Sequence, residues 1–149
     1  MFDGVKTYCM FIGYQRSGST LVRSLLDAHP SVIIAHELTA LKLVEAGVGK
    51  RSLYQLLLEN SQDRAQNKRQ LMHGYNYKVP NQWQGRFDEL RVIGDKKAAA
   101  STAQLAKNPR LLHWLRNTVA TEVKFVHVVR NPYDNIATWC KRHSSTKNK

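Results

Sequence analysis

Residues 8–26 read YCMFIGYQRSGSTLVRSLL, and their pattern predicts a strand, a loop and a helix in succession. Residues 8–12 form a short apolar run that ends at Gly13, which is typical of a buried strand. Residues 13–19 are polar and contain glycine and serine, as expected of a loop.

A helix is predicted to follow this loop from Thr20. Leucine and valine recur at helical spacing, with polar residues between them. We therefore expect one helical face made of Leu21, Val22, Leu25 and Leu26, with Arg23, Ser24 and Asp27 opposite.

The same alternation of short apolar runs and helical patterns continues along the chain. Three more strands are predicted, at residues 31–35, 91–94 and 123–129. Helices are predicted at residues 37–46, 52–68 and 98–107 and, after Asn-Pro pairs, from residues 108 and 131. Residues 74–86 carry aromatics, proline and glycine without a period, which indicates a loop. This order is typical of an α/β fold with a parallel sheet, in which ligands bind beyond the carboxyl ends of the strands.

Length and composition limit the class of protein. The chain has 149 residues, enough for one domain with its own core, and 42% are hydrophobic, which excludes a wholly disordered chain. No apolar run is long enough for a transmembrane helix, and residues 1–6 show no signal peptide. Cys9 and Cys140 lie far apart and form no CxxC pair, which argues against a disulfide scaffold or a zinc site. We therefore expect a reduced, cytoplasmic protein.

Positive charge dominates the sequence. Lysine and arginine number 23 against 11 aspartates and glutamates, a formal net charge of +12. Such a charge suits nucleic acid, an acidic membrane surface or a small polyanionic ligand. No helix-turn-helix, RNA-recognition or zinc-finger pattern accompanies it, so we expect no specific nucleic-acid partner. Residues 141–149 (KRHSSTKNK) form a basic, polar tail without an acidic residue.

The loop GYQRSGST, at residues 13–20, is a candidate anion site. Its two glycines have the spacing of a Walker A loop, but Ser19 stands where that loop has lysine. Backbone N–H groups of such a loop and the start of the next helix bind anions. The candidate ligands are the backbone at Gly18, the hydroxyls of Ser17, Ser19 and Thr20, and the guanidinium of Arg16. A tight turn without a ligand is the alternative.

Two segments resemble the sulfotransferase family. Residues 9–37 (CMFIGYQRSGSTLVRSLLDAHPSVIIAHE) are similar to the segment that binds the 5′-phosphosulfate of 3′-phosphoadenosine 5′-phosphosulfate in these enzymes. Residues 124–139 (KFVHVVRNPYDNIATW) are similar to their 3′-phosphate-binding strand, turn and helix. There an arginine and a hydroxyl residue eight positions later bind the 3′-phosphate. The matching positions are Arg130 and Thr138, although the family usually has serine at the second.

The resemblance also implies a fold. It predicts a three-layer α/β domain with a parallel sheet and the nucleotide-binding topology of P-loop NTPases. Domains of this family are longer and carry a later glycine-rich loop with a lysine. Residues 1–149 are therefore expected to be one sulfotransferase-like domain that is incomplete at its C-terminus.

Three catalytic roles follow from the resemblance. Arg16 matches a basic residue of the loop and would neutralise the leaving phosphate. Glu37 matches the catalytic glutamate of the tyrosylprotein-type branch and would be the general base. Lys96, in a Gly-Asp-Lys segment, matches a lysine that stabilises the transition state. The alternatives are His36 as the base, Lys97 in place of Lys96, and a merely structural Glu37 at the start of the next helix.

Structural roles are expected for three other polar residues. His29, just before a proline, should end a helix. Asp95 should orient neighbouring hydroxyls or amides. Asn131 should begin the last helix and so aim Arg130.

The predicted function is transfer of a sulfuryl group from 3′-phosphoadenosine 5′-phosphosulfate to a hydroxyl or amine, without a metal. By analogy with phosphoryl transfer, catalysis would rest on positioning and electrostatic stabilisation. A P-loop nucleotide kinase or NTPase is the alternative, favoured by the glycine spacing and opposed by the missing lysine. A nucleotide-binding fragment without activity is another. The acceptor is open between small molecules, carbohydrates, lipids and protein tyrosine.

Overall fold

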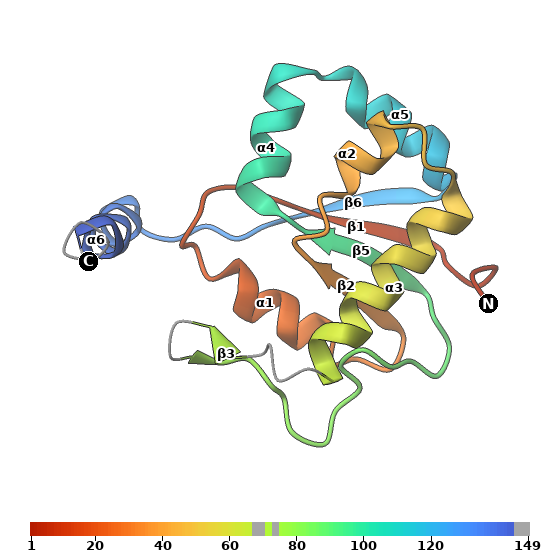
Figure 1. Cartoon of the computed structure of the whole chain (residues 1–149), viewed down its shortest axis with the longest axis horizontal. Coiled ribbons are helices and arrows are strands. Elements are labelled where there is room, and N and C mark those ends of the chain that lie inside the picture. Colours follow the sequence, from red (N-terminus) through yellow and green to blue (C-terminus); the bar gives the residue numbers. More distant parts are fainter. Residues whose placement is uncertain (67–70, 73–74, 145–149) are drawn as a thin grey trace.

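A parallel sheet of four strands forms the centre of the protein. The strands are β1 (Thr7–Ile12), β2 (Val32–His36), β5 (Val92–Lys96) and β6 (Glu122–His127). In the computed structural model, which describes residues 1–66, 71–72 and 75–144, they lie in the order β2-β5-β1-β6 (Figure 1). The α/β fold with a parallel sheet, predicted from the sequence, is confirmed.

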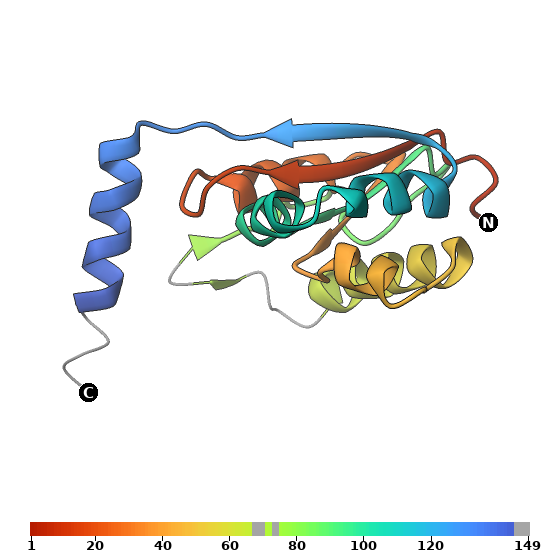
Figure 2. The same cartoon turned by 90° about the horizontal axis from the view of Figure 1, so that it is seen from above.

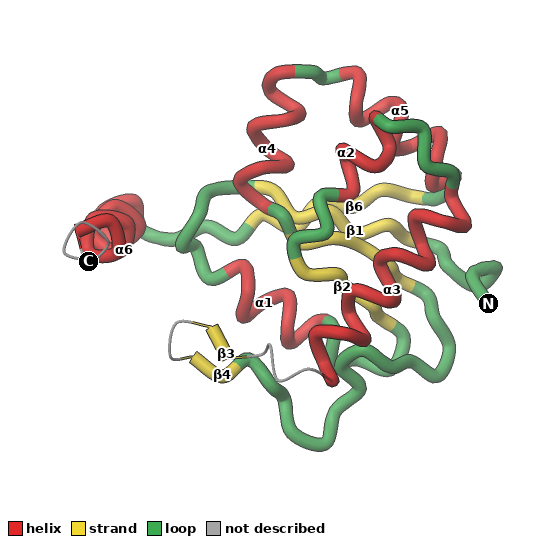
Figure 3. The backbone as a smooth tube through the Cα atoms, in the orientation of Figure 1, coloured by secondary structure: helices red, strands yellow, loops and turns green. Residues whose placement is uncertain are grey.

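The carboxyl ends of the strands meet at one edge of the sheet. β1 lies between β5 and β6, and Ile12 at its end pairs with His127 of β6. β2 pairs with β5, and His36 at its end lies opposite Lys96. The loops that follow β1 and β2 begin at this edge and then run in opposite directions (Figure 3). Residues just after the strands are therefore brought together.

Close packing of β1 on β5 depends on a glycine. A Cβ added at Gly94 would overlap the backbone carbonyl oxygen of Cys9. Glycine in a strand often marks such an approach of one backbone to another. Position 94 thus fixes the spacing of the two strands that support the loop.

Helices cover both faces of the sheet and one of its edges. α2, α4 and α5 lie over one face, and α1 lies over the other (Figures 1 and 2). α3 runs along the free edge of β2, where the backbone N–H of His36 donates to Asn60 Oδ1 at 2.7 Å. α6 stands clear of the sheet (Figure 2). The helices are α1 (Ser19–Leu26), α2 (Ala40–Glu45), α3 (Lys50–Gln66), α4 (Ala98–Lys107), α5 (Arg110–Val119) and α6 (Pro132–Ser144).

The core is divided between the two faces of the sheet. Along β1, Tyr8 and Met10 pack into the cluster beneath α2, α3 and α5, whereas Cys9 and Phe11 face α1. This alternation is the two-residue period of a strand buried on both faces. Burial raises the pKa of the Cys9 thiol to about 11, which suits the core role expected of it.

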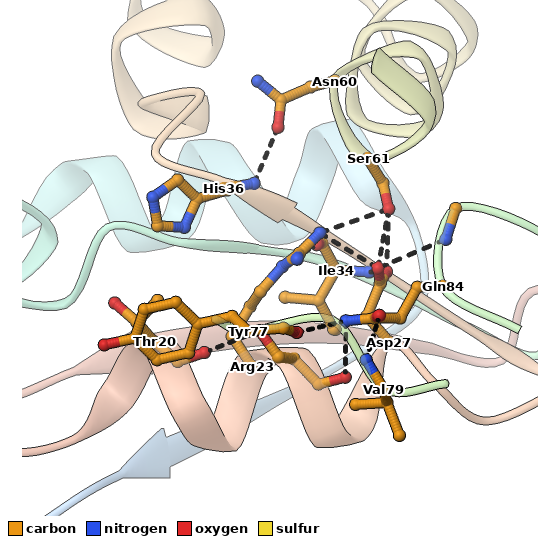
Figure 4. A network of polar contacts seen from close by, with 12 residues as sticks. Thr20, Arg23, Asp27, Ile34, His36, Asn60, Ser61, Tyr77, Val79 and Gln84 are labelled. Atoms are coloured by element: carbon orange, nitrogen blue, oxygen red, sulfur yellow. Dashed lines mark hydrogen bonds and ion pairs between the residues drawn. The ribbon is translucent and has the colours of Figure 1, made fainter. Parts of the chain in front are cut away.

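The prediction of which face of α1 is buried is wrong. Leu21, on the expected apolar face, is 52% exposed, whereas Arg23 and Asp27 are 0% exposed. Arg23 donates to Asp27 Oδ2 at 3.0 Å and to the carbonyl oxygen of Ile34 at 2.7 Å (Figure 4). Ser61 Oγ, on α3, lies 2.8 and 2.9 Å from the two oxygens of Asp27.

Hydrogen bonds explain why α1 buries this polar face. Asp27 also accepts the backbone N–H groups of Ile34, at 2.7 Å, and of Gly85, at 3.3 Å. Buried charges are tolerated when they are paired and hydrogen-bonded in this way. The network joins α1 to β2, α3 and the loop at Gly85, while Val22 and Leu26 supply the apolar contacts.

Two other segments differ from the prediction. α2 begins at Ala40 rather than residue 37, because Glu37 and Thr39 have left-handed backbone, with φ of 59° and 67°. β4 (Tyr75–Asn76) lies within the loop expected at residues 74–86, and it pairs antiparallel with β3 (Leu71–Met72), which precedes that loop. Of the expected basic tail, residues 141–144 belong to α6. Residues 67–68 of the expected third helix, residue 74 of the expected loop and residues 145–149 of the tail lie outside the described residues.

Candidate functional site

The loop between β1 and α1 leads directly into the start of the helix. Gly18 precedes α1 with φ of 94°, a left-handed conformation that glycine adopts without strain. Ser17 is buried, and its hydroxyl donates to the carbonyl oxygen of Tyr14 at 3.0 Å, so it holds the loop from within. Within the described chain, no side chain caps α1. The helix start therefore offers free N–H groups and partial positive charge to an anion.

A cavity of about 410 Å³ adjoins this loop. Five residues expected from the sequence line it, together with the alternative Lys97. They come from the loop and α1, from the end of β2 and from the end of β5: Arg16, Ser19, Thr20, Glu37, Lys96 and Lys97. Three cations face one carboxylate there, so the cavity suits a polyanion. The remaining lining residues are Tyr14 and Gln15, which belong to the candidate loop, and Ala98, Ala99 and Ala100, which no charge or motif marked in the sequence.

Glu37 forms ion pairs with both lysines. Lys96 Nζ lies 3.0 Å from Glu37 Oε1, and Lys97 Nζ lies 3.3 Å from Oε2. The Lys96 side chain is 4% exposed and that of Glu37 is 44% exposed. Burial acts to raise the pKa of Glu37, but the charge and hydrogen bond of Lys96 outweigh it and lower that pKa to about 2. Burial lowers the pKa of Lys96, and Glu37 opposes that effect.

Glu37 and Thr39 both have strained backbone. A non-glycine residue in the left-handed region costs on the order of 1–3 kcal/mol. Such strain persists where surrounding contacts impose it, often at functional sites. Asp95, on β5, supplies contacts here, since its carboxylate accepts backbone N–H groups on this segment. The prediction that Asp95 orients neighbouring amides is consistent with these bonds.

His36 is nearby but does not line this cavity. It is 9% exposed, and its Nδ1 is buried without a hydrogen-bond partner in the described structure. Burial and the charge of Lys96 lower the pKa of His36 to about 3. Glu37 lines the cavity and His36 does not, so position rather than basicity favours Glu37 over His36 as the base.

Arg16 has an unusual environment for a loop residue. Its backbone is left-handed, with φ of 63°, and the residue lines the cavity. Its Nε is buried without a hydrogen-bond partner in the part of the chain that the structure describes. A buried guanidinium N–H without a partner is rare in folded proteins, and the charge of Arg16 adds to that of the two lysines in the cavity.

A second cavity, of about 870 Å³, adjoins the first. The two share Tyr14, Gln15 and Ala99 in their walls. The second is lined largely by apolar side chains of the β6–α6 segment, with Arg130 among them. Arg130 Nη1 donates to the carbonyl oxygen of Arg16 at 3.3 Å, so the structure brings together the two segments that resemble sulfotransferases. Thr138 lies on α6 and is half-buried, but it lines neither cavity.

The expected structural residues form local contacts. His29 Nδ1 accepts the backbone N–H of Ser31 at 3.1 Å, just past the end of α1. Asn131 Oδ1 accepts the backbone N–H of Tyr133 at 3.0 Å at the start of α6. Arg130 Nε lies 3.8 Å from a carboxylate oxygen of Asp134, which supports its orientation.

Across residues 1–66, 71–72 and 75–144, the structure shows no group of three or more His, Cys, Asp or Glu side chains placed to hold a metal ion. No helix in the same residues combines the length and the apolar character needed to cross a membrane.

Comparison with known proteins identifies the family of the chain. The model of the sulfotransferase family matches residues 10–149, which is nearly all of the chain. No curated protein matches the chain significantly. The match covers the loop, the end of β2, the end of β5 and the β6–α6 segment, whose residues line the two cavities. The chain therefore belongs to the sulfotransferase family.

Proposed function

We propose that the chain transfers a sulfuryl group from 3′-phosphoadenosine 5′-phosphosulfate to an acceptor hydroxyl or amine. The observation that carries the proposal is the cavity in which Arg16, Glu37 and Lys96 meet from the ends of three strands. Membership of the sulfotransferase family supports sulfuryl transfer in general. The excess of cations over carboxylates in the cavity supports an anionic donor.

The two adjoining cavities suggest how the donor would lie. Its phosphosulfate would occupy the smaller cavity, against the start of α1 and the hydroxyls of Ser19 and Thr20. Its nucleoside would extend into the larger, apolar cavity, where Arg130 would meet the 3′-phosphate. The role of Thr138 stays a prediction from the family pattern.

Each catalytic residue has a distinct task in the proposed reaction. An acceptor oxygen or nitrogen attacks sulfur, and the bond between sulfur and the bridging oxygen breaks with its electron pair left on the 5′-phosphate. Glu37 takes the acceptor's proton. Lys96 and Arg16 neutralise the charge that develops on the bridging and phosphate oxygens. The products are the sulfated acceptor and 3′-phosphoadenosine 5′-phosphate.

Glu37 needs a change of environment to act as a base. With a pKa of about 2, a carboxylate paired to two lysines attracts a proton only weakly. A bound phosphosulfate would compete for Lys96 and Lys97, because both line the same cavity. The loss of those pairs would raise the pKa of Glu37. The base would thus become effective when the donor is in place.

The test is transfer of label from sulfur-35-labelled donor to a panel of acceptors: a simple phenol, a tyrosine peptide, a sugar and a primary amine. Glu37→Gln should lower kcat by about 100-fold or more while the KM for the donor stays within about threefold. Glu45→Gln, an exposed carboxylate on α2, is the matched control and should keep wild-type activity. Full activity of Glu37→Gln would contradict its role. Magnesium-dependent hydrolysis of ATP in place of sulfuryl transfer would instead support an NTPase.

A further inference from the structure

Asp95 is a buried carboxylate that faces backbone rather than a side-chain cation. It is 3% exposed, it lies on β5 next to Lys96, and it does not line the cavity. Its Oδ1 accepts the backbone N–H of Leu38 at 3.1 Å, and its Oδ2 accepts that of Ala40 at 2.9 Å. A strand thus bonds to a loop that lies more than fifty positions earlier in the sequence.

The loop that Asp95 bonds to is the one that carries Glu37. Thr39 precedes α2 with left-handed backbone, and no side chain of its own caps that helix. The backbone N–H of Glu37 donates to the carbonyl oxygen of Lys96 at 3.1 Å. The segment from Glu37 to Ala40 is therefore attached to β5 at both ends, by the strand backbone at one end and by the Asp95 carboxylate at the other.

We propose that Asp95 is a positioning residue that fixes residues 37–40 so that the Glu37 carboxylate faces Lys96 in the cavity. Two N–H groups bonded to one buried carboxylate hold the left-handed turns at Glu37 and Thr39, which isolated chains rarely adopt. Without that carboxylate the segment can relax, and Glu37 moves away from Lys96. The description of Glu37 as the base rests on the proposed function, whereas its placement by Asp95 does not.

Several other charged or titratable groups surround the carboxylates of Glu37 and Asp95. The groups that face Glu37 are Lys96, Lys97 and His36, with Arg16 in the same cavity. Those that act on or respond to Asp95 are Lys96, Tyr8 and Arg23. None of them bonds to the N–H groups of residues 38 and 40, so a change at Asp95 disrupts this pair of bonds while leaving the cations of the cavity in place.

The experiment uses Asp95→Asn, which keeps the shape of the side chain but has one acceptor atom and an NH₂ group that cannot accept. The pKa of Glu37 is followed by carbon-13 NMR of the carboxylates, with the Glu37 signal assigned by its loss in Glu37→Gln. In Asp95→Asn this pKa should rise from about 2 toward 4.5, because Glu37 leaves Lys96. With an acceptor in hand, kcat should fall about 100-fold with little change in the KM for the donor.

Asp27→Asn is the matched control. It also replaces a buried carboxylate that accepts two backbone N–H groups, but those belong to Ile34 and Gly85. The pKa of Glu37 should be unchanged in this variant. Ser61→Ala, in the same network, serves if Asp27→Asn does not fold. If Asp95→Asn does not fold, the combination of Asp95→Asn with Thr39→Gly is used, since glycine adopts the left-handed turn without strain.

Three outcomes distinguish the positioning role of Asp95 from the proposed catalytic role of Glu37. An unchanged Glu37 pKa in folded Asp95→Asn overturns the positioning role. So does an equal rise in Asp27→Asn or Ser61→Ala, because the effect would then be one of general stability. If Glu37→Gln keeps full transfer activity, the proposed function fails at the base, yet the titration still decides whether Asp95 places Glu37.

Discussion

Replacing Arg23 by methionine tests the buried network that holds α1 in place. The change removes three bonds: to Asp27 Oδ2 at 3.0 Å, to the carbonyl oxygen of Ile34 at 2.7 Å and to Ser61 Oγ at 3.3 Å. It also leaves the Asp27 carboxylate buried without its cation. Removing one partner of a buried ion pair lowers the free energy of unfolding by about 3–5 kcal/mol. We expect the free energy of unfolding at about pH 7 to fall by that amount.

The size of this loss should depend on pH in a defined direction. Burial raises the pKa of Asp27, and the charge of Arg23 is the largest effect that lowers it. Without Arg23 the pKa of Asp27 rises further above that of the unfolded chain, so the folded variant binds a proton more readily. The loss of stability is therefore largest above the raised pKa and shrinks as the pH falls through it.

Urea unfolding followed by circular dichroism between about pH 5 and pH 7 measures both effects. Arg91→Met is the control, because Arg91 pairs with Glu89 at 2.7 Å on the surface and should contribute less than about 1 kcal/mol. Combining Arg23→Met with Asp27→Leu should remove the pH dependence without recovering the stability, because the backbone N–H groups of Ile34 and Gly85 then lose their acceptor. A loss below about 1 kcal/mol for Arg23→Met, or one that grows at lower pH, would refute the reasoning.

Three further predictions concern the strands and the site. Gly94→Ala should destabilise the protein by about 2 kcal/mol or more, because its Cβ would overlap the carbonyl oxygen of Cys9. Gly49→Ala is the control, since open space surrounds Gly49, and it should not destabilise the protein. The urea midpoints of the two variants are compared, and equal midpoints would count against the close approach of β1 and β5. The pKa of His36 is about 3 in the folded protein, whereas His36 in the unfolded chain binds a proton below about pH 6.5. As the pH is lowered from about 6.5 to 4.5, the free energy of unfolding should therefore fall by up to about 1.4 kcal/mol per pH unit. His36→Gln should flatten that slope. An unaltered slope would mean that His36 titrates normally. Lys96→Met should raise the pKa of Glu37 toward 4.5 more than Lys97→Met does, because Lys96 lowers that pKa more than Lys97 does. Carbon-13 NMR titration of Glu37 in the two variants measures the order, and a larger rise in Lys97→Met would contradict it.

Much of the fold could be predicted because the buried strands are short apolar runs between loops. The grouping of Arg16, Glu37 and Lys96 could also be predicted, since the carboxyl ends of parallel strands share one edge of the sheet. The position of the site could thus be predicted from the apolar runs of the strands, the polar residues that follow them and the shared edge of a parallel sheet.

The polar contacts of the interior could not be predicted in the same way. Arg23 and Asp27 are four residues apart on a helix, the spacing of an ordinary surface pair, and only their partners on β2 and α3 explain their burial. The left-handed turns at Glu37 and Thr39 lie beside N–H groups that bond to Asp95, which is distant in the sequence. Hydrogen bonds between such distant residues leave no periodic pattern in a single sequence.

Calorimetric titration with 3′-phosphoadenosine 5′-phosphate tests most directly whether the two cavities form one donor site. The account predicts saturable binding of one nucleotide per chain, weakened about 10-fold or more by Arg16→Ala and by Arg130→Ala. Arg110→Ala, an exposed residue at the start of α5, should bind as the wild type does. Folded protein that gives no binding heat, or that binds magnesium-ATP as tightly as 3′-phosphoadenosine 5′-phosphate, would contradict it.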